Sequence, residues 1–381
     1  MRIVQLNPFF FPYAGGTERR ILELGKRLAR RHEVIVVTSH LPGTAARETI
    51  DGVEVRRLPS RFRLERHWNP PLVSTPGVGD ELQRLRPDVI DLHYRWAPNY
   101  HRAFARAARY SRLAFTYNNT YGEGTGLLRW ASLANDAWTR RFIRKADRIL
   151  CVSRFIQADL VRRGFPQDRL RVVPNGIDAA AARREADTGT VPPALQGKRY
   201  VCAVGRLVPI KAFDVAIQAL ASLPSDVHLA ICGEGPERAR LARAARANDV
   251  GDRVHLLGWV PEADKLRLVR EAIAFAHPAR FEAFGLAPLE AMALGTPVVA
   301  ARVGGLVEVV EGAGALVEPD APDELASALE SWMNPRLREA SGRACQRRAE
   351  AYDWDVAAQS LEAVYDELAH APPRTNYLTA A

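Results

Sequence analysis

Short apolar runs alternate with stretches of helical periodicity along most of the chain, and this alternation constrains the fold more than any other feature. In the N-terminal half, the expected strands are residues 2–7, 34–38, 53–58, 89–93, 113–117 and 148–152. Strands that alternate with helices are typical of a parallel sheet with helices on its faces. Because 381 residues suffice for two domains that each bury a core, we expect two doubly wound α/β domains that face each other across a cleft.

Residues 281–311 include two glutamates eight positions apart, Glu282 and Glu290, together with signals for the start and end of a helix. Glu282 is expected in a loop, because residues 285–288 are poor helix formers. Pro288 suits the first position of a helix, so Glu290 would fall in the first turn, where negative charge is favoured. Gly295 suits the position after the helix end. Taken alone, the pattern favours a structural role, with Glu290 offsetting the helix dipole and Glu282 solvated.

The surrounding residues change this interpretation. The run Glu282-Ala-Phe-Gly-Leu-Ala-Pro-Leu-Glu290, followed by Gly304-Gly305, resembles the signature of the family 4 glycosyltransferases. These are retaining enzymes with the two-domain GT-B fold, which transfer a sugar without a covalent enzyme intermediate in the usual description. The resemblance implies that Glu282 contacts the transferred sugar and that Glu290 holds the nucleotide ribose. It also implies donor contacts from Val260, near the base, and from Ala283, Phe284, Gly285 and Leu286.

The resemblance covers nearly the whole chain and predicts its division. The Asn175-Gly176 turn matches the family's crossover between domains. We expect an acceptor-side domain over residues 1–178, a connector over 179–198 and a nucleotide-sugar-binding domain over 199–355. A last helix, 356–371, would pack back on the first domain, followed by a tail, 372–381.

Two cations lie in the loop after the strand at 200–204. Arg206 and Lys211 suit a diphosphate, although surface salt bridges would explain them as well. The resemblance decides for phosphate, since both fall on the family's phosphate-binding pair, with Ala212 in place of the usual glycine. With fixed cations at the leaving group, we expect no metal and no other cofactor. Asp353 and Asp355 are expected to be surface carboxylates and not a metal pair.

The first domain offers a glycine pair and two polar side chains at strand ends. Gly15 and Gly16 lie between the first strand and a helix, where backbone N–H groups can approach a phosphate. Such a pair is more often a tight turn, but the resemblance places this loop against the donor diphosphate and the acceptor. His93 and Asn118 follow expected strands, and ligands of parallel sheets bind at those ends. Many family members have histidine where Asn118 stands, and asparagine cannot carry a proton, which leaves the donor sugar open.

The net charge of +9 indicates an anionic partner. No nucleic-acid-binding motif accompanies it, so an anionic substrate or an acidic membrane surface is favoured. Residues 127–145 carry Trp130, Ala134, Trp138 and Phe142 in one row and a basic end with Arg140, Arg141, Arg144 and Lys145. This helix either packs its aromatic row into the core or lies on a membrane surface. Residues 61–68 add support for the membrane.

The cysteines and the N-terminal residues favour a cytoplasmic location. The four cysteines are scattered without metal spacing, and the N-terminus is too short and polar for a signal peptide. We therefore expect buried, reduced thiols in a cytoplasmic protein, or one at the inner face of the cell membrane.

Together these features predict transfer of a hexose or hexosamine from a UDP- or GDP-linked sugar to an acceptor hydroxyl. The acceptor can be a saccharide, a lipid-linked molecule or a small molecule. A nucleotide-sugar epimerase or hydrolase on the same fold is the alternative, followed by a basic nucleic-acid or membrane binding protein.

Overall fold

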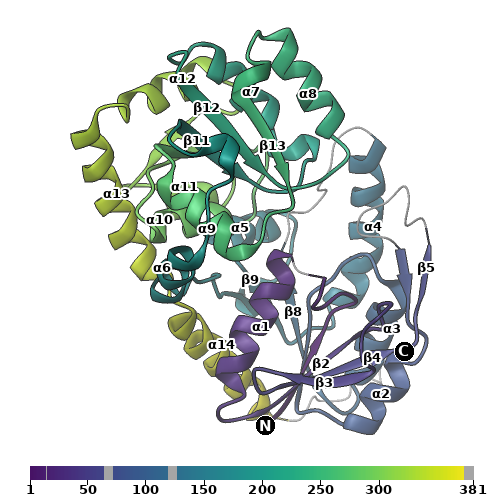
Figure 1. Ribbon diagram of the computed structural model, residues 1–381. Helices are drawn as coiled ribbons and strands as arrows, with labels where there is room; N and C mark the ends of the chain where they lie inside the picture. Colours follow the sequence, from purple (N-terminus) through teal and green to yellow (C-terminus); the bar gives the residue numbers. More distant parts are fainter. Residues whose placement is uncertain (14, 64–71, 119–126, 373–381) are drawn as a thin grey trace.

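The computed structural model describes residues 1–13, 15–63, 72–118 and 127–372, which form two α/β domains (Figure 1). The first sheet consists of β1 (Arg2–Leu6), β2 (Glu33–Ser39), β3 (Arg47–Ile50), β4 (Val53–Leu58), β7 (Val89–Leu92), β8 (Arg112–Tyr117), β9 (Arg148–Cys151) and β10 (Leu170–Val172). Its order is β10-β9-β8-β7-β1-β2-β4-β3, parallel except for β3 against β4. A two-stranded antiparallel pair joins β5 (Arg61–Arg63) to β6 (Leu72–Ser74).

The second sheet is parallel throughout. It consists of β11 (Arg199–Val204), β12 (Val227–Cys232), β13 (Val254–Gly258), β14 (Ala274–His277), β15 (Val298–Ala301) and β16 (Ala315–Val317). The order is β13-β12-β11-β14-β15-β16. In both sheets the strand order reverses beside the first strand of the domain, and ligands bind at such switch points. The predicted fold class, two doubly wound α/β domains, is confirmed.

Helices cover both sheets. In the first domain they are α1 (Gly16–Leu28), α2 (Val78–Leu85), α3 (Pro98–Ala107), α4 (Leu127–Ile143) and α5 (Arg154–Arg162). After it come α6 (Ala179–Thr188), α7 (Phe213–Ala221), α8 (Arg238–Ala247), α9 (Glu262–Glu271), α10 (Leu286–Ala293), α11 (Leu306–Val310), α12 (Pro322–Ser331), α13 (Pro335–Ala349) and α14 (Trp354–Ala369). Short 3-10 turns occupy Gln167–Arg169, Pro193–Leu195, Pro209–Lys211, Gly251–Arg253 and Glu350–Tyr352. In the described parts of the chain, no helix is both long and apolar enough to cross a bilayer.

The central strands are apolar on both faces because helices cover both sides of each sheet. In β2, for example, all residues after Glu33 are buried. Cys151, Cys202 and Cys232 lie in such strands, and all four cysteines are buried free thiols.

The last helix leaves the second domain and packs along the first, as Figure 1 shows for α14 beside α1. Its first residue, Trp354, is almost fully buried. A Cβ on Gly176 would lie 2.6 Å from the Trp354 backbone nitrogen, so the crossover turn needs glycine to approach the start of α14. Asp353 caps this helix, and Asp355 pairs with Arg27 at 2.6 Å. These two carboxylates therefore have structural partners.

Residues 179–198 hold α6, whose buried Ala182 and Ala186 face the second domain through contacts with α9 and α10. The chain thus reaches the second domain before β11 begins.

One local prediction is wrong. Helix α10 begins at Leu286 and not at Pro288, so Glu290 lies in its second turn. The cause is Gly285, whose φ of 108° lets the chain turn directly into the helix. Gly295, with φ of 81°, ends the helix as predicted.

The aromatic row of α4 faces the core only in part, since Trp138 and Phe142 are half-buried and contact the buried His101. From residue 130 onward, the buried residues of this helix are Ser132, Asp136, Thr139 and Ile143, while Trp130 is 73% exposed.

Candidate active site

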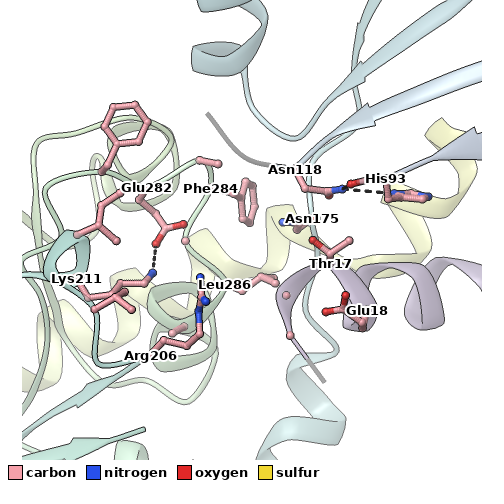
Figure 2. Close-up of a pocket in the computed structure, with 18 of the residues that line it drawn as sticks. Thr17, Glu18, His93, Asn118, Asn175, Arg206, Lys211, Glu282, Phe284 and Leu286 are labelled. Atoms are coloured by element: carbon pink, nitrogen blue, oxygen red, sulfur yellow. Dashed lines mark hydrogen bonds and ion pairs between the residues drawn. The ribbon is translucent and has the colours of Figure 1, made fainter. Parts of the chain in front are cut away.

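A cavity of about 400 Å³ lies between the two domains. Figure 2 shows its side chains pointing toward one another from both sides, with Lys211, Glu282 and Arg206 opposite Thr17, Glu18 and Asn118. The predicted residues that line it are Gly15, Gly16, His93, Asn118, Arg206, Lys211, Glu282, Ala283, Phe284, Gly285 and Leu286. The structure therefore brings together almost all residues that the sequence proposed for the site.

The wall from the second domain is built around the Glu282 carboxylate. Lys211 Nζ donates a hydrogen bond to Glu282 Oε2 at 2.6 Å, and His277 Nε2 lies 3.1 Å from the same oxygen. Within the described residues, Glu282 Oε1 has no hydrogen-bond partner. One oxygen is thus held by the protein, and the other remains available to a ligand in the cavity.

The protonation states of the side chains on this wall follow from burial and from their neighbours. Burial alone would raise the pKa of Glu282, but the Lys211 ammonium and the hydrogen bond with His277 outweigh burial and hold the pKa well below its usual range. Burial also lowers the pKa of His277, partly offset by Glu282. A neutral imidazole that donates from Nε2 leaves Nδ1 as an acceptor, and this buried atom has no partner among the described residues. At neutral pH the wall therefore holds a carboxylate, an ammonium and a neutral imidazole.

The loop that carries Glu282 is positioned by close backbone packing. Gly305 N–H donates to Glu282 O at 3.0 Å, and a Cβ on Gly304 would lie 1.9 Å from that carbonyl. From the first domain, Ser153 Oγ donates to Ala283 O at 2.8 Å. The Gly304-Gly305 pair is thus required for the shape of the site.

Arg206 enters the cavity on the same side as Lys211 (Figure 2). Both come from the segment between β11 and α7, where Ala212 adopts a left-handed conformation with φ of 52°. Glycine adopts that conformation without strain, which explains why the family usually has glycine there.

The wall from the first domain is largely neutral. Gln5 Oε1, which can only accept, takes a hydrogen bond from His93 Nε2 at 2.5 Å, and Gln5 Nε2 donates to the Tyr365 hydroxyl at 3.0 Å. His93 Nδ1 then faces Asn118 Nδ2 at 3.5 Å, as the dashed line in Figure 2 marks. Burial lowers the pKa of His93 to about 4. His93 is therefore a neutral side chain whose orientation is fixed by core residues. Asn118, which lies next to it, also lines the cavity.

Glu18 also belongs to this wall and was not among the predicted site residues. Its Oε1 accepts from Asn7 Nδ2 at 3.0 Å, and a Cβ on Gly15 would lie 2.7 Å from its other oxygen. Burial raises the pKa of Glu18 to about 7, against the opposing effect of its hydrogen bonds. Gly16 faces the other domain, since its Cβ would lie 3.3 Å from Leu286 Cδ1. The glycine pair thus permits two close approaches, one within the loop and one across the cavity.

Other lining residues were missed as well. Tyr94, Arg95 and Trp96 directly follow His93, so the strand-end argument that found His93 applied to them too. Tyr13, Asn175 and Phe281 are further examples.

Val260 and Glu290 do not line the cavity. Glu290 is 6% exposed, and its carboxylate pairs with Arg19 of α1 and, at 2.9 Å, with Lys265 of α9. Burial raises its pKa, but Lys265 and then Arg19 outweigh burial and lower it. In this structure Glu290 is thus part of an ion-pair link between the domains.

Comparison with known proteins gives the family. The sequence model of "Glycosyltransferase Family 4" matches residues 14–181, and that of "Glycosyl transferases group 1" matches residues 191–350. A D-inositol 3-phosphate glycosyltransferase from Streptomyces griseus is 30% identical over 403 residues, covering 92% of this chain and 84% of the relative. The chain belongs to the family 4 glycosyltransferases.

Other glycosyltransferases match over nearly the full length. A GDP-mannose-dependent phosphatidylinositol dimannoside mannosyltransferase from Mycobacterium tuberculosis is 28% identical and covers 97% of both chains. Among solved structures, sucrose-phosphate synthase from Thermosynechococcus elongatus superposes with a TM-score of 0.79 at 22% identity, over 96% of this chain and 98% of that one. The Anabaena protein HepE, in complex with UDP and glucose, gives 0.77 at 20% identity, over 96% and 100%. These structures show that the chain shares its two-domain fold with both proteins.

Proposed function

We propose that this family 4 glycosyltransferase moves a hexose or hexosamine from a UDP- or GDP-linked sugar to an acceptor hydroxyl, with retention at the anomeric carbon. The observation that carries the proposal is the Lys211–Glu282 ion pair in the interdomain cavity, with Arg206 beside it. The relatives' names support a nucleotide-sugar donor, since one is GDP-mannose-dependent.

The two cations act on the leaving group. When the bond between the anomeric carbon and the diphosphate breaks, negative charge grows on the diphosphate. Lys211 and Arg206 lie where they can take up that charge, and each cation–anion pair at about 5 Å contributes on the order of 3 kcal/mol at an effective dielectric near 20. No metal is part of this mechanism, because the chain itself supplies the positive charge.

Glu282 acts on the sugar. Its carboxylate stays ionised and has one oxygen open to the cavity, so it can accept hydrogen bonds from sugar hydroxyls and stabilise positive charge on the ring. By the family pattern, Glu290 holds the ribose. The remaining donor contacts come from residues 283–286 and from Val260.

The acceptor binds against the first domain. His93 and Asn118 offer neutral donors and acceptors there, and Glu18 adds a carboxyl group, all of which suit the hydroxyls of a polyol or sugar ring. The names of two relatives, which contain D-inositol 3-phosphate and phosphatidylinositol dimannoside, support such a ring, free or lipid-linked. We also infer peripheral contact with an acidic membrane at the cytoplasmic face, supported by the +9 charge.

The decisive experiment compares Lys211→Ala with Lys198→Ala, the same change at an exposed lysine outside the cavity. Nucleotide sugars are screened by mass spectrometry, and nucleotide release is then measured with and without acceptor. Lys211→Ala should lower turnover at least about a hundredfold, the effect of losing one preorganised charge, with an unchanged fold by circular dichroism. Lys198→Ala should retain turnover.

Near-normal turnover of Lys211→Ala would contradict the electrostatic role of Lys211. An epimer or free sugar as the main product in the presence of acceptor would instead show that the enzyme is not a transferase.

A further inference from the structure

A second cavity, of about 210 Å³, lies between α3 and α4, far from the Lys211–Glu282 pair in sequence and sharing no lining residue with the active site. Its walls are the outer side of α3 and the C-terminal end of α4, two helices that pack against each other on the side of the first domain opposite α14 (Figure 1). The lining residues are Arg102, Ala105, Arg106, Arg109, Phe142 and Lys145. We call this cavity the α3–α4 groove.

The groove gathers positive charge without compensation. Arg102, Arg106, Arg109 and Lys145 are all exposed, and none forms an ion pair with any residue that the structure describes. Arg102 and Arg106 are four positions apart on one helix, a spacing at which like charges repel and destabilise the helix. By contrast, Arg56 and Arg163 elsewhere on this domain pair with Glu54 and Asp159.

Helix α3 and the exposed side of α4 also lack acidic side chains. No aspartate or glutamate occurs from residue 92 to residue 122 of the sequence. The one acidic residue of α4, Asp136, is buried, and its carboxylate accepts from Arg95 at 2.6 Å. A ligand at the groove therefore meets cations and no opposing carboxylate from these helices.

Helix α4 adds an apolar margin and a further cation. Arg141 lies 4.7 Å above the Trp138 ring and 4.8 Å above the Phe142 ring, so aromatic rings and not carboxylates hold it. Trp130, 73% exposed, is three helical turns away from Arg141 and on the same face. Arg140, which belongs to the same basic end of the helix, instead donates to the Gly164 carbonyl at 3.2 Å and stacks on Phe165.

We propose that the α3–α4 groove binds phosphate groups of acidic membrane lipids, with the exposed face of α4 against the bilayer and Trp130 at its interface. Unpaired cations that line one recess suit a phosphate, and exposed aromatic residues on the same helix face as cations are typical of a helix that lies on a membrane. A flat basic surface would serve less well, because only a recess lets cations surround one headgroup. This inference gives the proposed membrane contact a location and a ligand, and so rests on that part of the proposed function.

The location has a consequence for the acceptor. Asp136 on the buried side of α4 holds Arg95, and Arg95 lines the active cavity. A membrane-bound α4 therefore places the acceptor side of the cavity close to the bilayer, where a lipid-linked hydroxyl is available.

The test is co-flotation of the full-length protein with vesicles of phosphatidylcholine, with or without phosphatidylglycerol, at low ionic strength. Wild type should float only with the acidic vesicles. Arg102→Glu/Arg106→Glu should lower partitioning at least about tenfold, since each cation near an acidic surface contributes to binding. The control, Arg243→Glu/Arg246→Glu on α8, changes net charge equally at exposed arginines outside the groove and should bind like wild type.

Inorganic phosphate tests the ligand. At equal ionic strength it should displace the protein from vesicles more effectively than chloride, because it competes for the groove while both salts screen alike. Equal displacement by the two salts, or equal loss in the α3 and α8 variants, would show that only net charge matters and would overturn the site. Binding of free phosphate without vesicle binding would overturn the lipid assignment, as would equal binding of single-stranded RNA.

Turnover with a water-soluble acceptor separates this inference from the enzymatic one. The Arg102→Glu/Arg106→Glu variant should keep that turnover and its thermal stability while losing vesicle binding. A variant that fails to fold is replaced by Arg109→Gln/Lys145→Gln, which removes charge without reversing it, and for which the same loss is expected.

Discussion

The two walls of the active cavity differ in kind. The second-domain wall carries fixed charge, with Lys211 and Glu282 paired at 2.6 Å. The first-domain wall presents a histidine with a pKa of about 4, an asparagine and a glutamate with a pKa of about 7. The charge of Arg95, which also lines this wall, is offset by the buried carboxylate of Asp136. Aromatic rings add to it, since Tyr94 and Tyr13 both contact Phe9.

This difference matches the two substrates. A diphosphate gains charge during the reaction, so a wall of preorganised charge stabilises the transition state more than the ground state. A neutral hydroxyl acceptor gains little from fixed charge and is selected by hydrogen bonds and shape. Residues of the charged wall should therefore control rate, and those of the neutral wall should control which acceptor is used.

The first prediction tests whether the two walls act separately, by removing an ion pair that joins the two domains outside the cavity. Arg19 of α1 pairs with Glu290, and at 3.1 Å with Glu262. In Arg19→Ala, Glu290 keeps Lys265 but loses its partner on the other domain. If Glu290 holds the ribose, the KM for the donor should rise about tenfold, equivalent to about 1.4 kcal/mol, with a smaller change in kcat.

Steady-state titration of donor measures both constants, and Arg30→Ala, at an exposed arginine just past the end of α1, is the control. A large fall in kcat with unchanged donor KM would mean that Arg19 affects the charged wall itself and that the two walls are not separable.

The second prediction concerns the neutral wall, where Glu18 is the group that changes charge. Its pKa of about 7 in the folded protein lies above the ordinary value of 4.5, so the folded state binds the proton more tightly than the unfolded state. Its contribution to stability is therefore fully present below about pH 4.5 and is lost as pH rises through about 7. Over that range wild type should lose on the order of 3 kcal/mol that Glu18→Gln does not lose.

Urea unfolding at several pH values measures this difference in slope. Glu54→Gln, at a glutamate with no place in the cavity, serves as the control. Parallel pH dependences for wild type and Glu18→Gln would show that Glu18 is ionised in the folded protein and that the first-domain wall is charged after all.

The charged wall was also the more predictable one from sequence. Glu282, Arg206 and Lys211 belong to local motifs whose spacing is fixed by one loop each, so a resemblance transfers them residue by residue. Glu18 did not stand out, because its burial depends on Asn7 and on the approach of Gly15, contacts that no periodicity encodes. The start of α10 was misplaced for a similar reason, since the φ of Gly285 and not Pro288 decides where the helix begins.

The fold was predictable because strand alternation in a parallel sheet follows from local hydrophobicity. The sequence did not determine which side of α4 faces the core, because that side is mainly polar. Asp136 is buried there only because Arg95 meets it, and the aromatic row was therefore an ambiguous guide to the core.

The smallest expected effect is that of a chelator. Lys211 and Arg206 are part of the chain and line the cavity together, so the positive charge at the leaving group does not depend on a dissociable ion. Nucleotide release and sugar transfer should thus proceed at an unchanged rate in excess EDTA, measured after preincubation and with added Mg²⁺ or Mn²⁺ as the comparison. Complete loss of activity with EDTA, restored by either ion, would mean that the second-domain wall is insufficiently charged by itself. A rate that is insensitive to EDTA in wild type but stimulated by Mg²⁺ in Lys211→Ala would be the sharper result, because the ion would then replace the charge that the lysine normally supplies.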